Sequence, residues 1–172
     1  MKKLISTVLA LLLLLSFAGC SKQTPPQAGP QGTPEELIAK IYEAHQALQL
    51  NVMTTNIDLA DGDMVTYNTG LDSGEKLSAL AVSEPMMSSQ AYSLVVAKVK
   101  DAADAAQVAK DIYDKVNTDK WICVGADTKT AAYCGDVVMF FMAGSQFSDS
   151  ATTESMLEAF KTVCGGNVTV VG

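Results

Sequence analysis

The sequence contains no arginine: its twelve cationic residues are all lysine, against nineteen aspartate and glutamate residues. Without guanidinium groups, the chain lacks the planar fork that binds phosphate or carboxylate bidentately. Its acidic balance also repels the phosphate backbone of nucleic acids. These features exclude nucleic acid as a partner. The same negative charge argues against electrostatic adhesion to an anionic membrane surface.

The common catalytic motifs are absent too. The chain has no glycine-rich phosphate loop, no GxSxG and no HExxH, and no two of its cysteines are spaced CxxC. His45 is the only histidine, so any histidine-dependent triad or metal site must include it. It lies within an apolar stripe, which favours a structural role. The sequence therefore predicts no cofactor and no metal site.

Two further sequence patterns could supply metal ligands, but each is a weak signal. Asp58, Asp61 and Asp63 cluster in a turn, but position 69 lacks the glutamate that an EF-hand calcium loop needs. Met86 and Met87 are adjacent and could offer thioethers to copper, but no MxxM series accompanies them. A solvated turn and ordinary core methionines are the favoured interpretations.

Only one long apolar stretch is present, Leu4–Leu15, and its twelve residues are too few to span a bilayer comfortably. Lys2 and Lys3 precede it, as in the positively charged start of a signal peptide. Residues 1–19 are therefore predicted to be a signal peptide that directs export.

The segment Leu15–Cys20 resembles the bacterial lipoprotein box, whose cysteine receives a diacylglycerol and further acyl chains such as palmitate. Phe17 stands where such signals usually carry leucine. The alternatives are an ordinary secretory signal cut near Ala18 and an uncleaved anchor. We expect Cys20 to attach the protein to the outer face of the bacterial cell membrane, which makes the membrane its first partner.

Residues 20–32 are predicted to be the lipidated cysteine and a disordered tether. Ser21–Gly32 contains three prolines and no aliphatic residue larger than alanine, so it cannot bury enough surface to fold. Cleavage before Cys20 leaves ten lysines against nineteen acidic residues, a formal charge of −9.

Residues 33–172 are predicted to form a single α+β domain, with an N-terminal helix and extension at 33–90. Thr33, Pro34 and Glu36 form the capping box and first-turn proline of a helix that ends near Leu50. Its apolar stripe comprises Leu37, Ile38, Ile41, Tyr42, His45 and Leu48. The extension is turn-rich, with short strands expected at Met64–Tyr67 and Leu77–Val82.

Residues 91–172 are predicted to form a ferredoxin-like βαββαβ core, which is a four-stranded antiparallel sheet with two helices on one face. The expected strands are Tyr92–Val99, Trp121–Gly125, Ala131–Met142 and Val168–Val171, and the expected helices are Asp101–Asn117 and Ser150–Cys164.

The stretch Val137–Met142 is apolar at every position, which is typical of a strand covered on both faces. One cover for the second face is the N-terminal helix. The other is a protein partner that docks on the sheet.

Three cysteines follow Cys20, namely Cys123, Cys134 and Cys164, and disulfides persist in the oxidising setting outside the cytoplasm. If the strands near Trp121 and Ala131 form a hairpin, Cys123 and Cys134 face each other and form a candidate disulfide. The alternative is three buried thiols that act as small apolar groups.

The segments YSLVVAKVKDAADAAQVAKDIYDKV, DKWICVGA and GDVVMFFM resemble a family of uncharacterised lipoproteins from Gram-positive bacteria, known as a domain of unknown function. Lys120–Gly125, the KWICVG motif, is the most specific part. The resemblance implies a surface lipoprotein, and it implies no activity, ligand or catalytic residue.

The favoured function is therefore a non-catalytic module that binds a ligand or partner outside the membrane. The alternative is a thiol-dependent or metal-assisted envelope enzyme that uses Cys123, Cys134 and His45.

Overall fold

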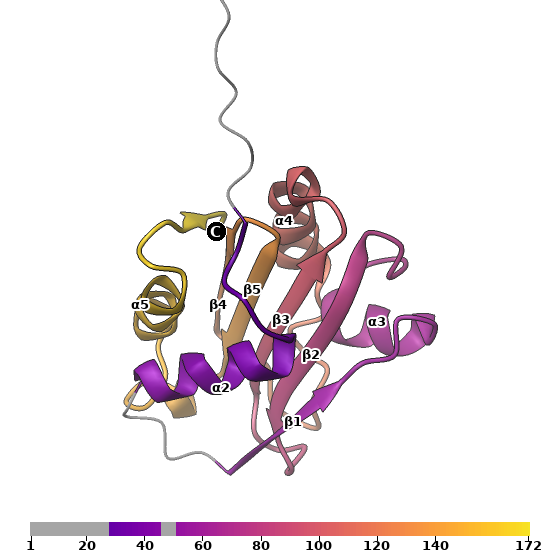
Figure 1. Ribbon diagram of the computed structural model, residues 1–172. Helices are drawn as coiled ribbons and strands as arrows, with labels where there is room; N and C mark the ends of the chain where they lie inside the picture. The colour runs from indigo at the N-terminus through magenta and orange to yellow at the C-terminus, as the bar shows by residue number, and fades with distance from the viewer. Residues whose placement is uncertain (1–27, 46–50) are drawn as a thin grey trace, which may run out of the picture.

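The computed structural model describes residues 28–45 and 51–172, and a six-stranded antiparallel sheet of order β1-β2-β3-β5-β4-β6 forms its centre (Figure 1). Four α-helices are described with the sheet, so the α+β fold class is confirmed. In chain order the elements are α2 (Pro34–His45), β1 (Val52–Asn56), α3 (Gly62–Thr69), β2 (Leu77–Pro85), β3 (Tyr92–Val99), the 3-10 turn η1 (Ala102–Asp104), α4 (Ala105–Lys115), β4 (Thr128–Cys134), β5 (Val137–Ala143), the 3-10 turn η2 (Ser145–Phe147), α5 (Thr153–Val163) and β6 (Thr169–Val170).

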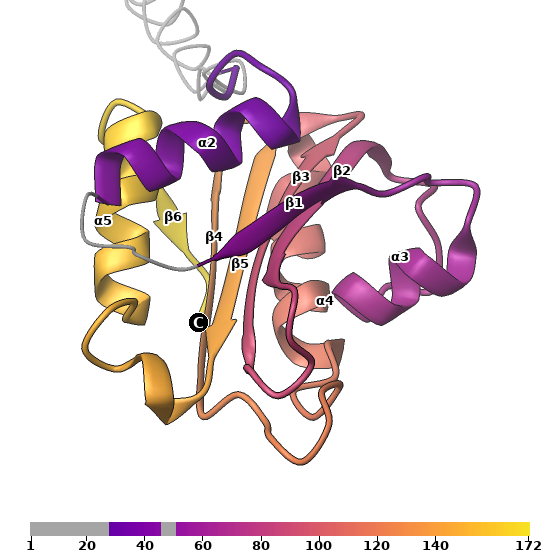
Figure 2. The ribbon, with the colours of Figure 1, turned by 90° about the horizontal axis from the view of Figure 1, so that it is seen from below.

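Strand β5 is buried at all seven of its residues, as its apolar sequence predicted. Alternate side chains of a strand point to opposite faces, so β5 contributes to two cores. Met139 and Phe141 enter the first core, under α2 and α5, whereas Val138 and Phe140 enter the second core, under α3 and α4. Figure 2 shows these helix pairs on opposite sides of the sheet.

Helix α2 begins at the predicted capping box. The Thr33 amide donates to Glu36 Oε2 (2.9 Å), and the Glu36 amide donates to Thr33 Oγ1 (3.2 Å). The predicted stripe is buried at Leu37, Ile38 and Ile41 in the first core. The predicted cover of the second sheet face is thus α2, joined by α5. The predicted end of this helix, including Leu48, lies outside the described residues.

The chain order from β3 to β6 is the predicted βαββαβ, but the ferredoxin-like arrangement is not confirmed. Strand β6 pairs with β4 at the sheet edge, while β2 pairs with β3. Connections between parallel strands are almost always right-handed. The connections from β3 to β4 and from β5 to β6 both cross the sheet in the same direction. They start, however, from β3 and β5, which run antiparallel to each other. Right-handedness then puts α5 on the face opposite α4, as the two cores show.

Two predicted strands are wrong in the second half of the chain. Trp121–Gly125 is a loop, in which Cys123 adopts a left-handed φ of 60°. Ala131–Met142 is not one strand but parts of β4 and β5, which form a hairpin. Gly135 and Asp136 form its two-residue turn, and Gly135 has the positive φ, 59°, that such a tight turn requires at its first central position.

The predicted strand Met64–Tyr67 is also wrong, because these residues belong to α3. The Asp61 carboxylate accepts a hydrogen bond from the Met64 amide (3.0 Å) and caps the helix start. Gly70, with a φ of 72°, ends it. These two capping residues outweigh the strand-like alternation between them. The predicted strand Leu77–Val82 is confirmed as part of β2.

The chain enters the domain beside the β4–β5 turn. The Gly29 amide donates to Asp136 Oδ1 (2.9 Å). A Cβ at Gly29 would lie 2.5 Å from the Cys134 carbonyl oxygen, so only glycine fits there. Lys98 Nζ lies 3.4 Å from Asp136 Oδ2 and completes this clamp. The predicted tether boundary at residue 32 is therefore too late, since contact with the domain begins by residue 29.

The variant Gly135→Ala distinguishes the hairpin from the single continuous strand that the sequence predicted. In the hairpin, alanine must adopt a positive φ, which lowers the free energy of unfolding by about 1–2 kcal/mol. In a continuous strand, the same change would raise stability by roughly 0.5–1 kcal/mol. Urea unfolding measures the sign. Gly62→Ala, where an added Cβ has no neighbour within 4 Å, is the control and should change stability little.

Candidate functional site

Exposed apolar side chains gather at one place on the described surface. Four of them line a hollow of about 260 Å³ beside α3. Exposed apolar side chains grouped around a hollow make a candidate binding surface. The large apolar side chains exposed among the described residues are Met53, Met64, Tyr67, Met86, Met87, Ile122 and Val170. We name the site the methionine hollow; it is lined by Met53, Thr55, Ile57, Met64, Tyr67, Asn68, Val82, Glu84, Pro85 and Met86.

Strands β1 and β2 supply one wall of the methionine hollow. In their antiparallel register, Met53 lies opposite Glu84 and Thr55 opposite Val82. Directly opposed residues project from the same face of a sheet. These four side chains therefore point together to the face that carries α3. Because β1 is an edge strand, this wall stands at the border of the sheet.

Helix α3 supplies the other wall. Met64, Tyr67 and Asn68 are spaced three and four residues apart, so they share one helical face. Val65, on a different face, is fully buried in the second core and attaches the helix to the sheet. Met64 and Tyr67 stay 41% and 46% exposed as a result.

A buried ion pair lies behind the hollow. The Lys120 side chain is 0% exposed, and its Nζ lies 2.6 Å from Glu84 Oε1. The same ammonium donates to Asn68 Oδ1 (3.5 Å) and lies 4.8 Å from the ring centre of Tyr67 and 5.4 Å from that of Trp121. Lys120 therefore connects the loop after α4 with β2 and α3, and so holds both walls of the hollow.

Burial lowers the pKa of Lys120 below its ordinary value, and the attraction of Glu84 opposes this shift. Desolvation is the larger of these two effects, and the nearby Glu84 carboxylate stabilises the charged form of Lys120. Glu84 itself is 22% exposed and lines the hollow. The hollow therefore combines exposed methionines and a tyrosine with the polar side chains of Thr55, Asn68 and Glu84.

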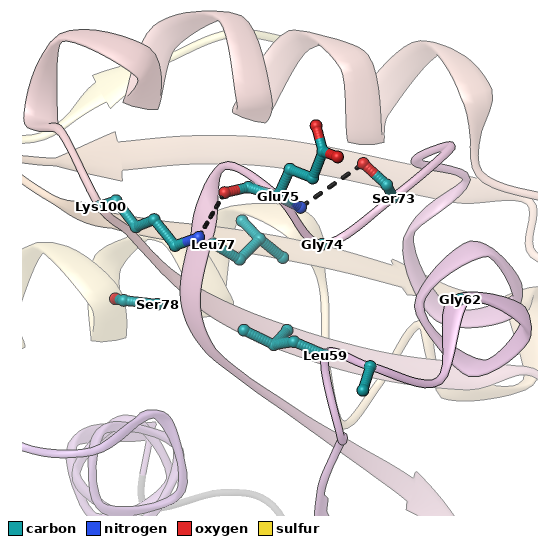
Figure 3. A pocket seen from close by; sticks show the side chains of 9 residues that line it. Leu59, Gly62, Ser73, Gly74, Glu75, Leu77, Ser78 and Lys100 are labelled. Carbon is teal, nitrogen blue, oxygen red and sulfur yellow. Dashed lines mark hydrogen bonds between the residues drawn. The ribbon is translucent and has the colours of Figure 1, made fainter.

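A second depression, a shallow groove of about 620 Å³, lies between the loop before α3 and the start of β2 (Figure 3). Lys100, the basic residue that lines this groove, donates a hydrogen bond to the Glu75 carbonyl oxygen (2.7 Å), so its ammonium already has a partner within the protein. Gly74 packs closely on Leu59, where an added Cβ would lie 3.1 Å from the carbonyl oxygen. No exposed large apolar side chain lines this groove, which makes it the weaker candidate.

The predicted disulfide between Cys123 and Cys134 does not form, because the hairpin that would pair them is absent. Cys123 lies in an exposed loop, which the hydrogen bond from the Ile122 amide to the Ser88 carbonyl oxygen (3.0 Å) holds near the β2–β3 connection. Cys134 is buried at the far end of β4. The length of β4 separates these regions by roughly 20 Å. The expectation that all three thiols are buried is also wrong for Cys123.

His45 lies apart from the cysteines. Its Nε2 is 2.8 Å from Ser155 Oγ in the first turn of α5, whereas Cys164 caps the other end of that helix. Its Nδ1 is buried without a hydrogen-bond partner, and burial lowers the pKa of His45. The Nε2 contact links the end of α2 to the start of α5, and the structural role of His45 stays a prediction.

The predicted turn aspartates serve the backbone. Asp58 Oδ1 accepts from the Ala60 amide (2.9 Å), and Asp61 caps α3. In residues 28–45 and 51–172, no three histidine, cysteine or acidic side chains gather as a metal site would require. The methionine hollow was missed from the sequence, because Met53, Met64 and Met86 converge only through strand register and the misassigned helix.

Comparisons of the chain with models of known protein families, with curated proteins and with solved structures find no match. The resemblance to surface lipoproteins therefore stays a prediction. Within the described residues, no helix combines the length and apolar character needed to cross a bilayer.

Lys120→Met tests whether the ion pair holds the site together. Removing one partner of a buried pair leaves the other charge uncompensated, so we expect the free energy of unfolding to fall by about 3 kcal/mol. The double variant Lys120→Met/Glu84→Leu should recover most of this loss, because apolar replacements fill the same space. Urea unfolding of the double variant and of the two single variants, Lys120→Met and Glu84→Leu, checks this. A double variant that loses the sum of the two single losses would contradict it.

Proposed function

We propose that this protein is a lipid-anchored, non-catalytic module on the outer face of the bacterial cell membrane, and that it binds an extended apolar segment of a partner protein at the methionine hollow. Three methionines and a tyrosine exposed around one hollow carry this proposal. Methionine side chains are flexible and polarisable, which suits surfaces that accept varied apolar partners.

The size of the hollow favours a polypeptide over a small molecule. At about 260 Å³ it lies below the usual range for small-molecule pockets, roughly 300–1,000 Å³. It has room for an anchoring apolar side chain or two. The neighbouring strand β1 is an edge strand, and an edge strand can pair with an extended segment through its outer backbone groups.

This proposal places the partner at a different surface from the one that the sequence favoured. A partner on a sheet face was expected as one alternative, but helices α2 and α5 cover one face and α3 and α4 cover the other. The β1 edge beside α3 remains for pairing.

The position of the hollow fits a membrane-anchored protein. The chain enters the domain at Gly29, beside Asp136, and Asp136 contacts Lys98 near the end of β3. Met86 of the hollow lies near the opposite end, because it precedes the start of β3. An eight-residue strand such as β3 is roughly 25 Å long. An anchor at Cys20 would therefore leave the hollow at the end of the domain farther from the chain entry, open to partners.

The enzymatic alternative is not proposed further. Cys123, Cys134 and His45 lie on a loop, at a strand end and at a helix end, and the described structure does not bring them together as a catalytic group.

Cys20→Ala tests the anchor. In the natural chain, membrane fractions should contain a mature protein whose first residue is Cys20, with a mass increase that matches a diacylglycerol and its acyl chains. The variant should lose both the lipid and the membrane association. A natural chain cut near Ala18 without lipid, or left uncut, would overturn the anchoring.

Met64→Asp tests the hollow. An acidic residue is well tolerated in the first turn of a helix, so α3 should persist. Peptides selected from a random decapeptide library on the natural protein should alternate large apolar residues, and the variant should bind them at least about tenfold more weakly.

Met87→Asp is the matched control, since Met87 is 61% exposed but does not line the hollow. It should bind the selected peptides as the natural protein does. Equal binding by the Met64→Asp variant, measured by fluorescence polarisation, would overturn the assignment of the hollow as the binding site.

A further inference from the structure

A pair of cysteines far apart in the sequence meets at the end of the domain where the chain enters. Cys134 ends β4 and points into the first core, and Cys164 caps α5, which packs on that same core. Besides burial, the neighbouring Cys134 raises the pKa of Cys164, as expected for two thiols packed in the same core. Sequence spacing gave no sign of this pair, because helix α5 brings Cys164 back onto β4.

We propose that Cys134 and Cys164 form the native disulfide of this protein, and that Cys123 remains a free thiol. The bond would close a loop of roughly 30 residues that contains β5 and α5. It would fix the end of α5 to the sheet. This inference goes beyond the proposed binding function, and it holds or fails independently of the methionine hollow.

The surroundings of the pair favour closure. Gly165 and Gly166 follow Cys164 with φ values of 68° and 96°, and an added Cβ at either would meet no neighbour within 4 Å. The backbone after Cys164 can therefore shift slightly as the sulfurs approach bonding distance. Cys164 is partly exposed and Cys134 is buried, so an oxidant reaches Cys164 first.

The oxidant is a disulfide, either of a small molecule or of an oxidoreductase outside the cytoplasm. Cys164 loses its proton and attacks one sulfur of that disulfide, and the other sulfur leaves as a thiolate. The deprotonated Cys134 then attacks Cys164 Sγ and displaces the second thiolate. Two S–H bonds are lost and one S–S bond forms, while the oxidant gains two electrons and two protons. Burial raises the pKa of Cys164 well above its ordinary value, so little Cys164 thiolate is present at neutral pH and this exchange is slow there.

Peptide mapping of the full chain gives a direct test, because trypsin places each of these cysteines on a separate peptide. Cleavage after lysine yields residues 121–129, 130–161 and 162–172. The purified protein is treated with oxidised glutathione, alkylated and digested without reduction. Peptides 130–161 and 162–172 should appear joined, with a mass lower than their sum by two hydrogen atoms. Peptide 121–129 should be unlinked and carry either the alkyl group or one glutathione, because exposed Cys123 can exchange with the oxidant.

Two outcomes would overturn the proposal: alkylation of all three peptides after oxidation, and a link from peptide 121–129 to either of the others. Cys123→Ser should keep the link and serves as the matched control, whereas Cys164→Ser should abolish it. The oxidised natural chain should also unfold at a Tm roughly 10 °C above that of the reduced chain. Because the mapping uses the natural chain, a variant that folds poorly does not affect its result.

Discussion

The architecture depends on one constraint, that strand β5 has no polar face. Because every one of its residues is buried, helices must cover both sides of the sheet. Helices α2 and α5 meet this need on one side and α4 meets it on the other, over β4 and β5. The sheet needs less cover toward the β1 edge, because the residues of β1 are only partly buried. The short helix α3 covers this edge incompletely. The methionine hollow is the surface that this incomplete cover leaves.

The ion pair of Lys120 and Glu84 gives the hollow a defined shape. A charged group with no exposed side-chain surface is retained at a considerable desolvation cost, which another apolar residue would avoid. In return, one ammonium contacts Asn68, Tyr67 and Trp121 as well as Glu84. Direction-dependent contacts of this kind fix the position of α3 more exactly than apolar packing would.

The parts of the fold that were predictable are those with local signals. The Thr33–Glu36 capping box and the unbroken apolar run of β5 depend on neighbouring residues alone. The Gly135 turn was missed because Ala131–Cys134 and Val137–Met142, on either side of it, are apolar, so the two strands were read as one. The placement of β6 and the meeting of Met53, Met64 and Met86 depend on crossover direction and strand register. No short stretch of sequence encodes those properties.

The glycine clamp at the chain entry has a mechanical consequence for a protein held by its N-terminus. A pull on residue 28 reaches Asp136 through the Gly29 hydrogen bond before it reaches α2. Asp136 adjoins β5, which is hydrogen-bonded to strands on both sides. Shear load on an anchored chain would thus enter the sheet beside its most firmly held strand. Without the clamp, the same load would act first on α2 and peel it from the first core.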